Sequence, residues 1–526
     1  MTPDVRAELA AIEREIFARR PEHSIDPSLD RIIALTSLLG DPQRSYPVIH
    51  ITGTNGKTST ARMTETLLRV RGLRTGLFTS PHLTSIRERI SIDGEPLAAE
   101  RFIEIYREIE PYLKLVDTGQ ANTGQANTGQ ANTGRPVRLS FFEVLTGMAF
   151  AAFADAPVDV AVIEVGMGGT WDNTNVADGV VAIATPISID HAQYLGNTVE
   201  AIAADKAGII KPGAIAVLAQ QPVGAAAELI RRAVRVGASV AREGIEFGVL
   251  SRELAIGGQQ LAIKGLLGEY HDLFLPLFGA YQAANASCAL AAVEAFSGAA
   301  GSPGASPAEP DGRVGAEADD DDEADAVPAD VVRADLGPVA REPGGLDAGL
   351  VRTAFAMMTS PGRFEIVRRS PVVLVDSAHN PAGMAATAAT LTESFGPAEV
   401  IAVVAVSADK DVAGILDELE PVAAGIVATT NSSPRALGAA ELAEIAMPVF
   451  GPDRVHVAER LDDAIEVAVG LADEASAAIG GPLAGLAGLA GPGAEGPEAA
   501  AGTVVLITGS VITAGDARLL LTGGGE

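Results

Sequence analysis

The chain has 526 residues, of which 47% are hydrophobic and 20% charged, a composition typical of a globular protein with two or three domains. Its formal net charge of −30 at pH 7 excludes a general nucleic-acid binder, because a phosphate backbone requires a basic surface. The single cysteine, Cys288, excludes an intramolecular disulfide framework. With no secretory leader and no apolar membrane span, we expect a cytoplasmic protein without a membrane partner.

Three low-complexity stretches divide the sequence. They are a Thr-Gly-Gln-Ala-Asn repeat at 119–134, an acidic Gly/Pro/Ala-rich stretch at 297–345 and an Ala/Gly-rich stretch at 475–502. Their small and polar residues cannot bury a core, so we predict a surface insertion, a solvated linker and a flexible loop. The predicted domains are therefore 1–296 and 346–526, joined by the acidic linker.

Short β-rich runs alternate with helical patterns along both predicted domains. The predicted strands are Val48–Ile51, Thr75–Thr79, Val158–Val165, Gly179–Thr185, Ala214–Leu218, Val372–Asp376, Glu399–Val406, Ala424–Thr429 and Thr503–Thr508. The predicted helices are Thr58–Val70, Ala99–Leu113, Phe141–Ala154, Thr198–Ala207, Glu441–Ala446 and Asp462–Ala472. Such alternation predicts an α/β fold with mostly parallel sheets, a larger N-terminal domain and a smaller Rossmann-like C-terminal domain. Ligands then bind beyond the carboxyl ends of the strands.

The segment that follows the first predicted strand has the features of a phosphate-binding turn. Gly53 and Gly56 allow the backbone to turn tightly, and Lys57 and Thr58 open a helix. This arrangement directs free amides and the positive end of the helix toward phosphate. The spacing is shorter than in the usual G-x-x-x-x-G-K-[ST] motif. The predicted N-terminal domain is therefore a P-loop ATPase.

Polar residues stand where other predicted strands of this domain end. Ser80, Glu164 and the pair Asp190-His191 each follow an apolar run. Taken singly, such a pair is more often a hydrogen-bonded turn. Beside the phosphate turn, the same side chains could surround a Mg²⁺ ion.

Further candidates lie near the end of a helix and in the second domain. Lys206 follows a helical pattern, and from its position alone it is a surface lysine near a helix C-terminus. Asp376, His379 and Asn380 stand on a strand-to-loop exit, just after Arg363, whose guanidinium suits phosphate oxygens. The alternative for Asp376 and Asn380 is a turn that their side chains stabilise.

As a set, these motifs resemble the Mur ligase superfamily, and within it the folylpolyglutamate synthases with dihydrofolate synthase activity. The resemblance rests on the segments Gly53–Thr58, Thr79–Leu83, Glu164–Gly169, Asp190-His191, Asp205–Lys211, Gln282–Asn285, Pro361–Arg363 and Asp376–Pro381. The segments occur in the order found in the family and cover most of the chain outside the three low-complexity stretches.

The resemblance implies ATP and Mg²⁺ as cofactors and assigns residues to each. The nucleotide contacts it implies are Gly53, Asn55, Gly56, Lys57, Thr58, Ser59, Asn285, Arg363 and Asp376. The implied metal ligands are Thr58, Ser80, Glu164, His191 and Lys206. Lys206 matches the lysine that the family carbamylates, and a monovalent cation is a further candidate. The implied catalytic groups are Lys57, His191, Lys206 and His379.

The resemblance also implies a pterin pocket. Its residues are Asp26, Ser28, Leu29, Ser140, Phe141, Phe142, Glu143 and Asp172. In this pocket Phe141 or Phe142 could stack on a pterin ring, and Glu143 could accept hydrogen bonds from its N–H groups.

The implied activity is ATP-dependent ligation of L-glutamate to a dihydropteroate or reduced folate carboxylate through an acyl phosphate, by a monomer without a nucleic-acid partner. One alternative is a Mur-type ligase acting on a UDP-linked peptidoglycan precursor, but residues 1–48 are too few for the additional domain that such ligases carry. The other is a non-catalytic P-loop ATP-binding switch, which leaves the Asp376 cluster and the Asp205-Lys206 element without a role.

Overall fold

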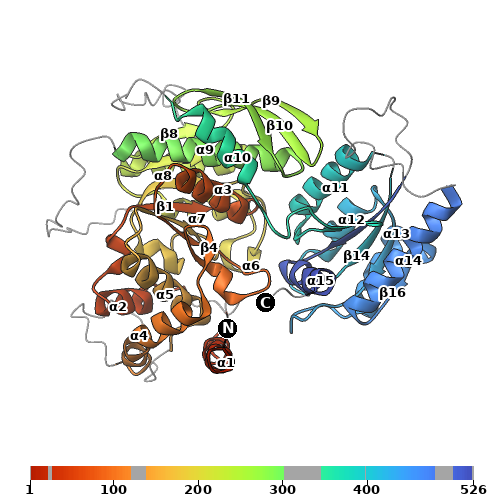
Figure 1. Cartoon of the computed structure of the whole chain (residues 1–526), viewed down its shortest axis with the longest axis horizontal. Coiled ribbons are helices and arrows are strands. Elements are labelled where there is room, and N and C mark those ends of the chain that lie inside the picture. The colour runs from red at the N-terminus through yellow and green to blue at the C-terminus, as the bar shows by residue number, and fades with distance from the viewer. Residues whose placement is uncertain are drawn as a thin grey trace, which may run out of the picture.

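The computed structural model describes residues 2–21, 27–119, 138–300, 345–396, 398–479 and 502–523. The predictions for the three low-complexity stretches therefore fall largely outside the described residues. The described residues form an N-terminal and a C-terminal domain that lie side by side (Figure 1). No helix in the described part of the chain is long and apolar enough to span a bilayer. The α/β prediction with mostly parallel sheets is confirmed.

An eight-stranded sheet in the order β4-β3-β2-β5-β1-β6-β7-β8 is the centre of the N-terminal domain. Its strands are β1 (Val48–Thr52), β2 (Thr75–Phe78), β3 (Ile90–Ile92), β4 (Glu95–Pro96), β5 (Val160–Glu164), β6 (Gly179–Ala184), β7 (Ile215–Leu218) and β8 (Ser239–Arg242). All pair in parallel except β3 and β4. Every residue of β1 is buried, because helices cover both faces of the sheet.

The helices of this domain divide between the two faces. They are α1 (Pro3–Phe17), α2 (Asp30–Leu38), α3 (Lys57–Val70), α4 (Ala99–Asp117), α5 (Phe141–Asp155), α6 (Ala192–Leu195), α7 (Val199–Lys206), α8 (Val223–Val236) and α9 (Ala280–Ala300). Successive residues of a strand point to opposite faces, so Ile49 and Ile51 pack in the same core as α3 and α9, whereas Val48 packs in the core of α4 and α5. Helices α1 and α2 belong to that second core.

A separate antiparallel sheet follows β8 and was not predicted from the sequence. It consists of β9 (Gly248–Ala255), β10 (Gly258–Lys264) and β11 (Glu269–Leu275). Gly257, with φ of +77°, occupies the tight turn between β9 and β10, where glycine is favoured. The buried side chains of β10 and β11 pack against α9.

Helix α10 (Ala348–Met357) belongs to the N-terminal domain, although residues 346–526 were predicted to form the C-terminal one. Its buried Val351 and Phe355 are part of the core that contains α3, α9 and β11. The hydrophobic face of α10 explains this placement, because the nearest apolar surface is that of α3 and β11. The C-terminal sheet starts only at Glu365.

The C-terminal domain is a six-stranded sheet in the order β12-β13-β17-β14-β15-β16, with helices on both faces. The strands are β12 (Glu365–Arg369), β13 (Val372–Val375), β14 (Glu399–Val404), β15 (Ala423–Ala428), β16 (Val455–Val457) and β17 (Thr503–Thr508), and only β12 is antiparallel to its neighbour. The helices are α11 (Pro381–Phe395), α12 (Val412–Leu419), α13 (Ala439–Phe450), α14 (Leu461–Ile479) and α15 (Val511–Thr522). Because β17 pairs in the middle of the sheet, the end of the chain completes the core.

The packing of α10 can be tested by truncating its buried aromatic residue. We expect Phe355→Ala to lower the free energy of unfolding by about 3–5 kcal/mol, because it leaves a cavity in the N-terminal core. Urea unfolding with hydrogen exchange read in α3 and β11 would measure the loss. Met357→Ala, at an exposed position of the same helix, is the control and should change stability little. Equal stability of the two variants would contradict the assignment of α10 to this core.

Candidate active site

The turn between β1 and α3 is closely packed at both of its glycines. Gly53 has φ of +141°, and a Cβ there would overlap the side chain of Thr185. Gly56 has φ of +88°, and a Cβ there would lie 2.5 Å from Oδ1 of Asn285. Only glycine allows this path, because other residues rarely adopt such φ values and would also collide.

Hydrogen bonds fasten the turn to the segment after β6. The amides of Thr54 and Asn55 donate to the carbonyl of Pro186, at 3.0 and 3.3 Å, and Thr54 Oγ1 donates to the carbonyl of Ser188 at 3.0 Å. The first amides of α3 have no intrahelical acceptor, as at every helix start. They remain available for an anion, with the helix dipole in support.

Two lysines converge on the same turn. Lys57 Nζ donates to the carbonyls of Gly53 and Thr54 at 3.2 and 3.1 Å, and Lys206 Nζ donates to that of Gly53 at 2.8 Å. Burial, with the nearby charge of Lys57, lowers the pKa of Lys206 to about 7. The surface position expected for Lys206 from its local sequence is therefore wrong. Gly169 explains why, since a Cβ there would lie 2.6 Å from the carbonyl of Lys206 and keep α7 away.

A buried carboxylate lies beside the start of α3. Thr58 Oγ1 donates to both oxygens of Glu164, at 2.9 and 3.0 Å, and the Ser80 amide donates to Oε2 at 3.2 Å. Burial raises the pKa of Glu164, although Lys57 opposes that shift. No group of three His, Cys, Asp or Glu side chains placed to hold a metal occurs among the described residues. The structure thus brings Thr58, Ser80 and Glu164 together, with hydroxyl oxygens beside one carboxylate.

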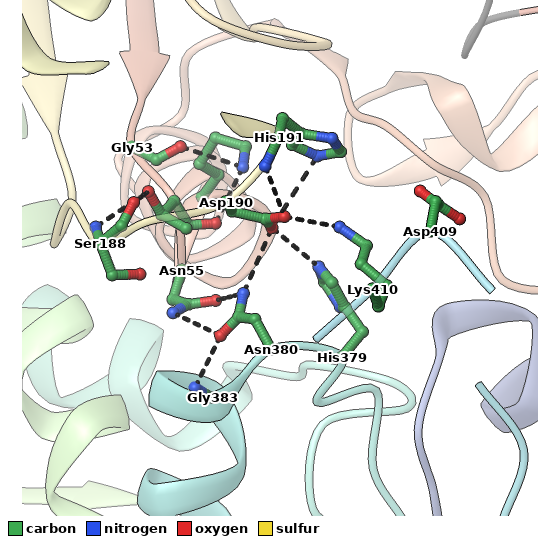
Figure 2. A network of polar contacts seen from close by, with 12 residues as sticks. Gly53, Asn55, Ser188, Asp190, His191, His379, Asn380, Gly383, Asp409 and Lys410 are labelled. Atoms are coloured by element: carbon green, nitrogen blue, oxygen red, sulfur yellow. Dashed lines mark hydrogen bonds and ion pairs between the residues drawn. The ribbon is translucent and has the colours of Figure 1, made fainter. Parts of the chain in front are cut away.

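Side chains from both domains meet at Asp190, as Figure 2 shows. Lys410 Nζ lies 2.6 Å from Oδ1, and Asn380 Nδ2 donates to Oδ2 at 3.3 Å. The Nε2 atoms of His379 and His191 are 3.7 and 3.8 Å from Oδ2. Burial alone would raise the pKa of Asp190, but His191, Lys410 and His379 hold it well below its usual value. Asp190 therefore stays anionic at the domain boundary.

Both histidines at this carboxylate are neutral at pH 7. Burial lowers the pKa of His191 to about 4, and Lys410 and Lys57 act in the same direction. Burial and Lys410 likewise lower the pKa of His379 to about 4, although Asp190 opposes both shifts. His191 has φ of 52°, in the left-handed region, and its amide donates to Asp190 Oδ1 at 2.8 Å.

The phosphate turn itself contacts the C-terminal domain. The side-chain amides of Asn55 and Asn380 exchange hydrogen bonds of 3.2 and 3.1 Å, and the hydroxyls of Ser59 and Ser360 are 2.8 Å apart (Figure 2 for the asparagines). Lys410 was not predicted from the sequence, although it follows strand β14. The criterion that selected Ser80, a polar residue after a predicted strand, applies to Lys410 as well.

The remaining nucleotide candidates lie near the turn but differ in their partners. Asp376 accepts hydrogen bonds from the amides of Phe364 and Ala378, each at 2.9 Å, and from Thr387 Oγ1 at 2.8 Å. These bonds match the turn-stabilising alternative. Asn285 lies against Gly56 and bonds with Gln282, whereas Arg363 lines a small cavity between the domains.

A cavity of about 450 Å³ extends between the domains next to these groups. Of the predicted pterin residues, it is lined by Ser140, Phe141, Phe142, Glu143 and Asp172. Ser28 and Leu29 are not among its lining residues, and Asp26 lies outside the described residues. Ser28 instead bonds through Oγ with the amide of Asp30 (3.1 Å), at the start of α2.

Glu143 is already engaged in this cavity. Its Oε1 accepts a hydrogen bond from Arg31 Nε at 2.8 Å, and its Oε2 accepts one from the Ser140 amide at 2.6 Å, which completes a capping box on α5. Arg31 was not predicted from the sequence, although its position on the amphipathic helix α2, opposite a predicted carboxylate, was a usable signal. Both oxygens of Glu143 therefore already accept a hydrogen bond, which leaves fewer lone pairs for a ligand.

Aromatic and cationic groups define the two ends of the cavity. The ring of Phe141 stacks on Phe17 with centroids 5.3 Å apart, and the Arg89 guanidinium lies 5.0 Å from its centroid. The C-terminal domain contributes Lys410 and Arg435. One end therefore suits a flat ring, and the other suits negatively charged groups.

Two family models match the chain. One describes the Mur ligase middle domain and covers residues 117–293, and the other describes the glutamate ligase domain of Mur ligases and covers 362–479. A dihydrofolate synthase/folylpolyglutamate synthase from Mycobacterium tuberculosis is 48% identical, over 99% of this chain and 95% of the relative. The chain belongs to the dihydrofolate synthase/folylpolyglutamate synthase family of Mur ligases. It is therefore an ATP-dependent ligase.

Further members of the family agree with this assignment. A folylpolyglutamate synthase from Lacticaseibacillus casei is 31% identical over 77% of this chain and 82% of its own length. The solved structure of the Mycobacterium tuberculosis folylpolyglutamate synthase complexed with ADP has a TM-score of 0.80 at 46% identity, covering 98% of this chain and 99% of that one. The family resemblance predicted from the motifs is confirmed.

The electrostatic role of Lys410 can be tested through the two histidines. We expect Lys410→Met to raise the pKa of His191 and of His379, because a nearby cation no longer opposes their protonation. Titration of the imidazole resonances by NMR would measure both shifts, with Lys410→Arg as the charge-preserving control. Unchanged titration of both histidines in Lys410→Met would show that Lys410 does not act on them.

Proposed function

We propose that this chain joins the α-amino group of L-glutamate to a carboxylate of a dihydropteroate or reduced folate, with conversion of ATP to ADP and phosphate. The observation that carries the proposal is the 450 Å³ cavity, which has an aromatic end in the N-terminal domain and a cationic end in the C-terminal domain. It lies beside a phosphate turn, in a chain that belongs to the dihydrofolate synthase/folylpolyglutamate synthase family.

The pterin end of the substrate would lie against Phe141. A flat heteroaromatic ring gains from stacking on an aromatic side chain and from a guanidinium over the ring system. Arg89 already takes that position relative to Phe141. We assign the predicted residues Phe142 and Asp172, which also line the cavity, to the same end.

The reaction needs an activated carboxyl group, because carboxylate oxygen is a poor leaving group and phosphate is a good one. The substrate carboxylate attacks the terminal phosphorus of ATP, which releases ADP and forms the acyl phosphate. The glutamate amine then attacks the acyl carbon, and phosphate leaves from the tetrahedral intermediate. The chain contributes mainly positioning and positive charge, through Lys57, the first amides of α3 and Arg363.

A Mg²⁺ ion fits the oxygen atoms beside the phosphate turn. Thr58, Ser80 and Glu164 would hold it, since hydroxyl and carboxylate oxygens are its usual protein ligands and the Glu164 carboxylate is buried next to Thr58 and Ser80. When bound, the ion neutralises charge on the phosphate oxygens. His191 was predicted as a further ligand. It lies beside Asp190, and we propose it as a ligand from that position.

The incoming glutamate carries two carboxylates, and its amine must lose a proton. Lys410 and Arg435 line the C-terminal end of the cavity, where they would bind those carboxylates. His379 is neutral at pH 7 and lines the same cavity, so its imidazole can accept the proton of the amine.

Lys206 is suited to carbamylation by CO₂. Its low pKa leaves a large fraction of the amine neutral at pH 7, and a neutral amine is the form that reacts. The carbamate would turn a cation beside Gly53 into an anion, which could hold a second Mg²⁺ or a monovalent cation.

The two alternatives are less well supported. Helices α1 and α2, which precede the phosphate turn, pack into the core of the N-terminal domain rather than forming a separate nucleotide-sugar domain. A non-catalytic ATP-binding switch does not account for the cavity, whose lining residues come from both domains. A monomeric state, the lack of a nucleic-acid partner and a cytoplasmic location stay predictions from the sequence.

A substrate panel tests the proposed activity. We expect glutamate-dependent ADP release with dihydropteroate or tetrahydrofolate, a product heavier by one glutamyl residue, and no turnover of a UDP-muramoyl peptide. Lys57→Ala should lower the rate by about 10²–10³-fold or more with folding intact, because it removes charge stabilisation at the phosphates. Undiminished turnover of this variant, or activity confined to the UDP-linked substrate, would refute the proposal.

Carbamylation of Lys206 can be tested directly. With ¹³C-labelled bicarbonate at pH 8, we expect a carbamate carbon signal by NMR that disappears on acidification and is missing in Lys206→Arg. Lys264→Arg, at an exposed lysine, is the control and should keep the signal. A spectrum without the signal in the wild-type chain would contradict carbamylation under these conditions.

A further inference from the structure

A second cavity, of about 210 Å³, borders the large one at Pro81 and His82. Its walls come from both domains: Thr58 and Arg62 of α3 on one side, and residues of the C-terminal domain on the other. Thr58 belongs to the phosphate turn, so the cavity begins where the terminal phosphate of a nucleotide would lie. The function proposed above does not use Arg62.

Two guanidinium groups, those of Arg62 and Arg363, line this cavity. Within the part of the chain that the structure describes, neither Arg62 nor Arg363 forms a side-chain hydrogen bond or an ion pair. Burial lowers the pKa of Arg62; the carboxylates of Glu88, Glu164 and Glu65 oppose that shift, and the charge of Arg363 adds to it. Both cations line one partly buried cavity, where an anion held between the two guanidinium groups would be favourable.

The other charged residues of the cavity have partners already. Arg518 Nε donates to Glu365 Oε1 at 3.2 Å. The carboxylate of Glu88 accepts the side-chain hydroxyl of Thr84 and the amides of Leu83 and Ser85, at 2.9 and 3.0 Å. These bonds keep the pKa of Glu88 below its usual value despite burial. Glu88 therefore acts on Arg62 through its charge, without a hydrogen bond to it.

We propose that this cavity binds a phosphate oxyanion, with Arg62 and Arg363 as its ligands. The planar fork of guanidinium N–H groups matches two oxygens of a phosphate. The proposal rests on the function proposed above for its source of phosphate. That source is either the terminal phosphate of bound ATP or the phosphate ion released when the amide forms.

The wall on the far side shows how the anion could leave. Leu83 packs against Gly362, where a Cβ would lie 2.9 Å from Leu83 Cδ1, and the carbonyl of Leu83 approaches Gly515 so closely that a Cβ there would overlap it. These contacts join the N-terminal and C-terminal domains directly. Because the wall is shared, a separation of the domains would open the cavity and release its contents.

Binding measurements on Arg62→Met test the proposal. Calorimetry with the ADP-bound full-length chain measures the affinity for inorganic phosphate, and a second titration of the free chain uses the β,γ-methylene analogue of ATP. We expect about a tenfold loss of affinity in at least one titration, equivalent to ~1.4 kcal/mol. ADP lacks the terminal phosphate, so its affinity should stay unchanged, and Arg231→Met, at an exposed arginine of α8, should alter nothing.

The two titrations distinguish the sources. A loss confined to inorganic phosphate supports a site for the released ion, and a loss confined to the analogue supports a contact with the terminal phosphate. Unchanged affinities in both titrations, or an equal loss for ADP, would overturn the proposal. If Arg62→Met fails to fold, Arg62→Gln takes its place, and Arg62→Lys should retain part of the affinity. Both titrations omit folate and glutamate. Their outcome therefore does not depend on which acid substrate the chain uses.

Discussion

The carboxylate of Asp190 accepts Lys410 and Asn380 from the C-terminal domain, while its own segment, through Pro186 and Ser188, holds the phosphate turn. A buried carboxylate is costly unless cations and hydrogen-bond donors surround it. Here Lys410, His379 and Asn380 come from the C-terminal domain and add to His191 of the same segment, so contact between the two domains stabilises the anion. The geometry of the site and the arrangement of the domains thus depend on the same group.

This arrangement also sets the protonation of the site. Lys410 and Lys57 oppose a proton on His191, and burial does the same, so the imidazoles near Asp190 remain neutral at pH 7. Lys206 loses charge for a similar reason, since it is buried near another lysine. A cluster of like charges and low solvent access therefore prepares several groups for chemistry that their usual pKa values would not allow.

Most of the regular elements were predictable, because strands β1 and β5 are apolar runs that end in polar residues and the apolar run of β14 follows Glu399. The antiparallel sheet β9–β11 was not predicted, since its strands alternate weakly and no residue of β9 is buried. The membership of α10 in the N-terminal core was not predictable either. A helix after a long low-complexity stretch carries no local signal of the domain against which it packs.

The sequence by itself determined the phosphate turn and the family, because glycines at required positions and residues that follow strands leave a local pattern. It did not determine the state of Lys206, the turn role of Asp376 or the engagement of Glu143 by Arg31. Those depend on which groups, distant in sequence, become neighbours once the chain is packed. Burial and the charges of such neighbours set hydrogen-bond partners and pKa values, and only the tertiary structure brings them together.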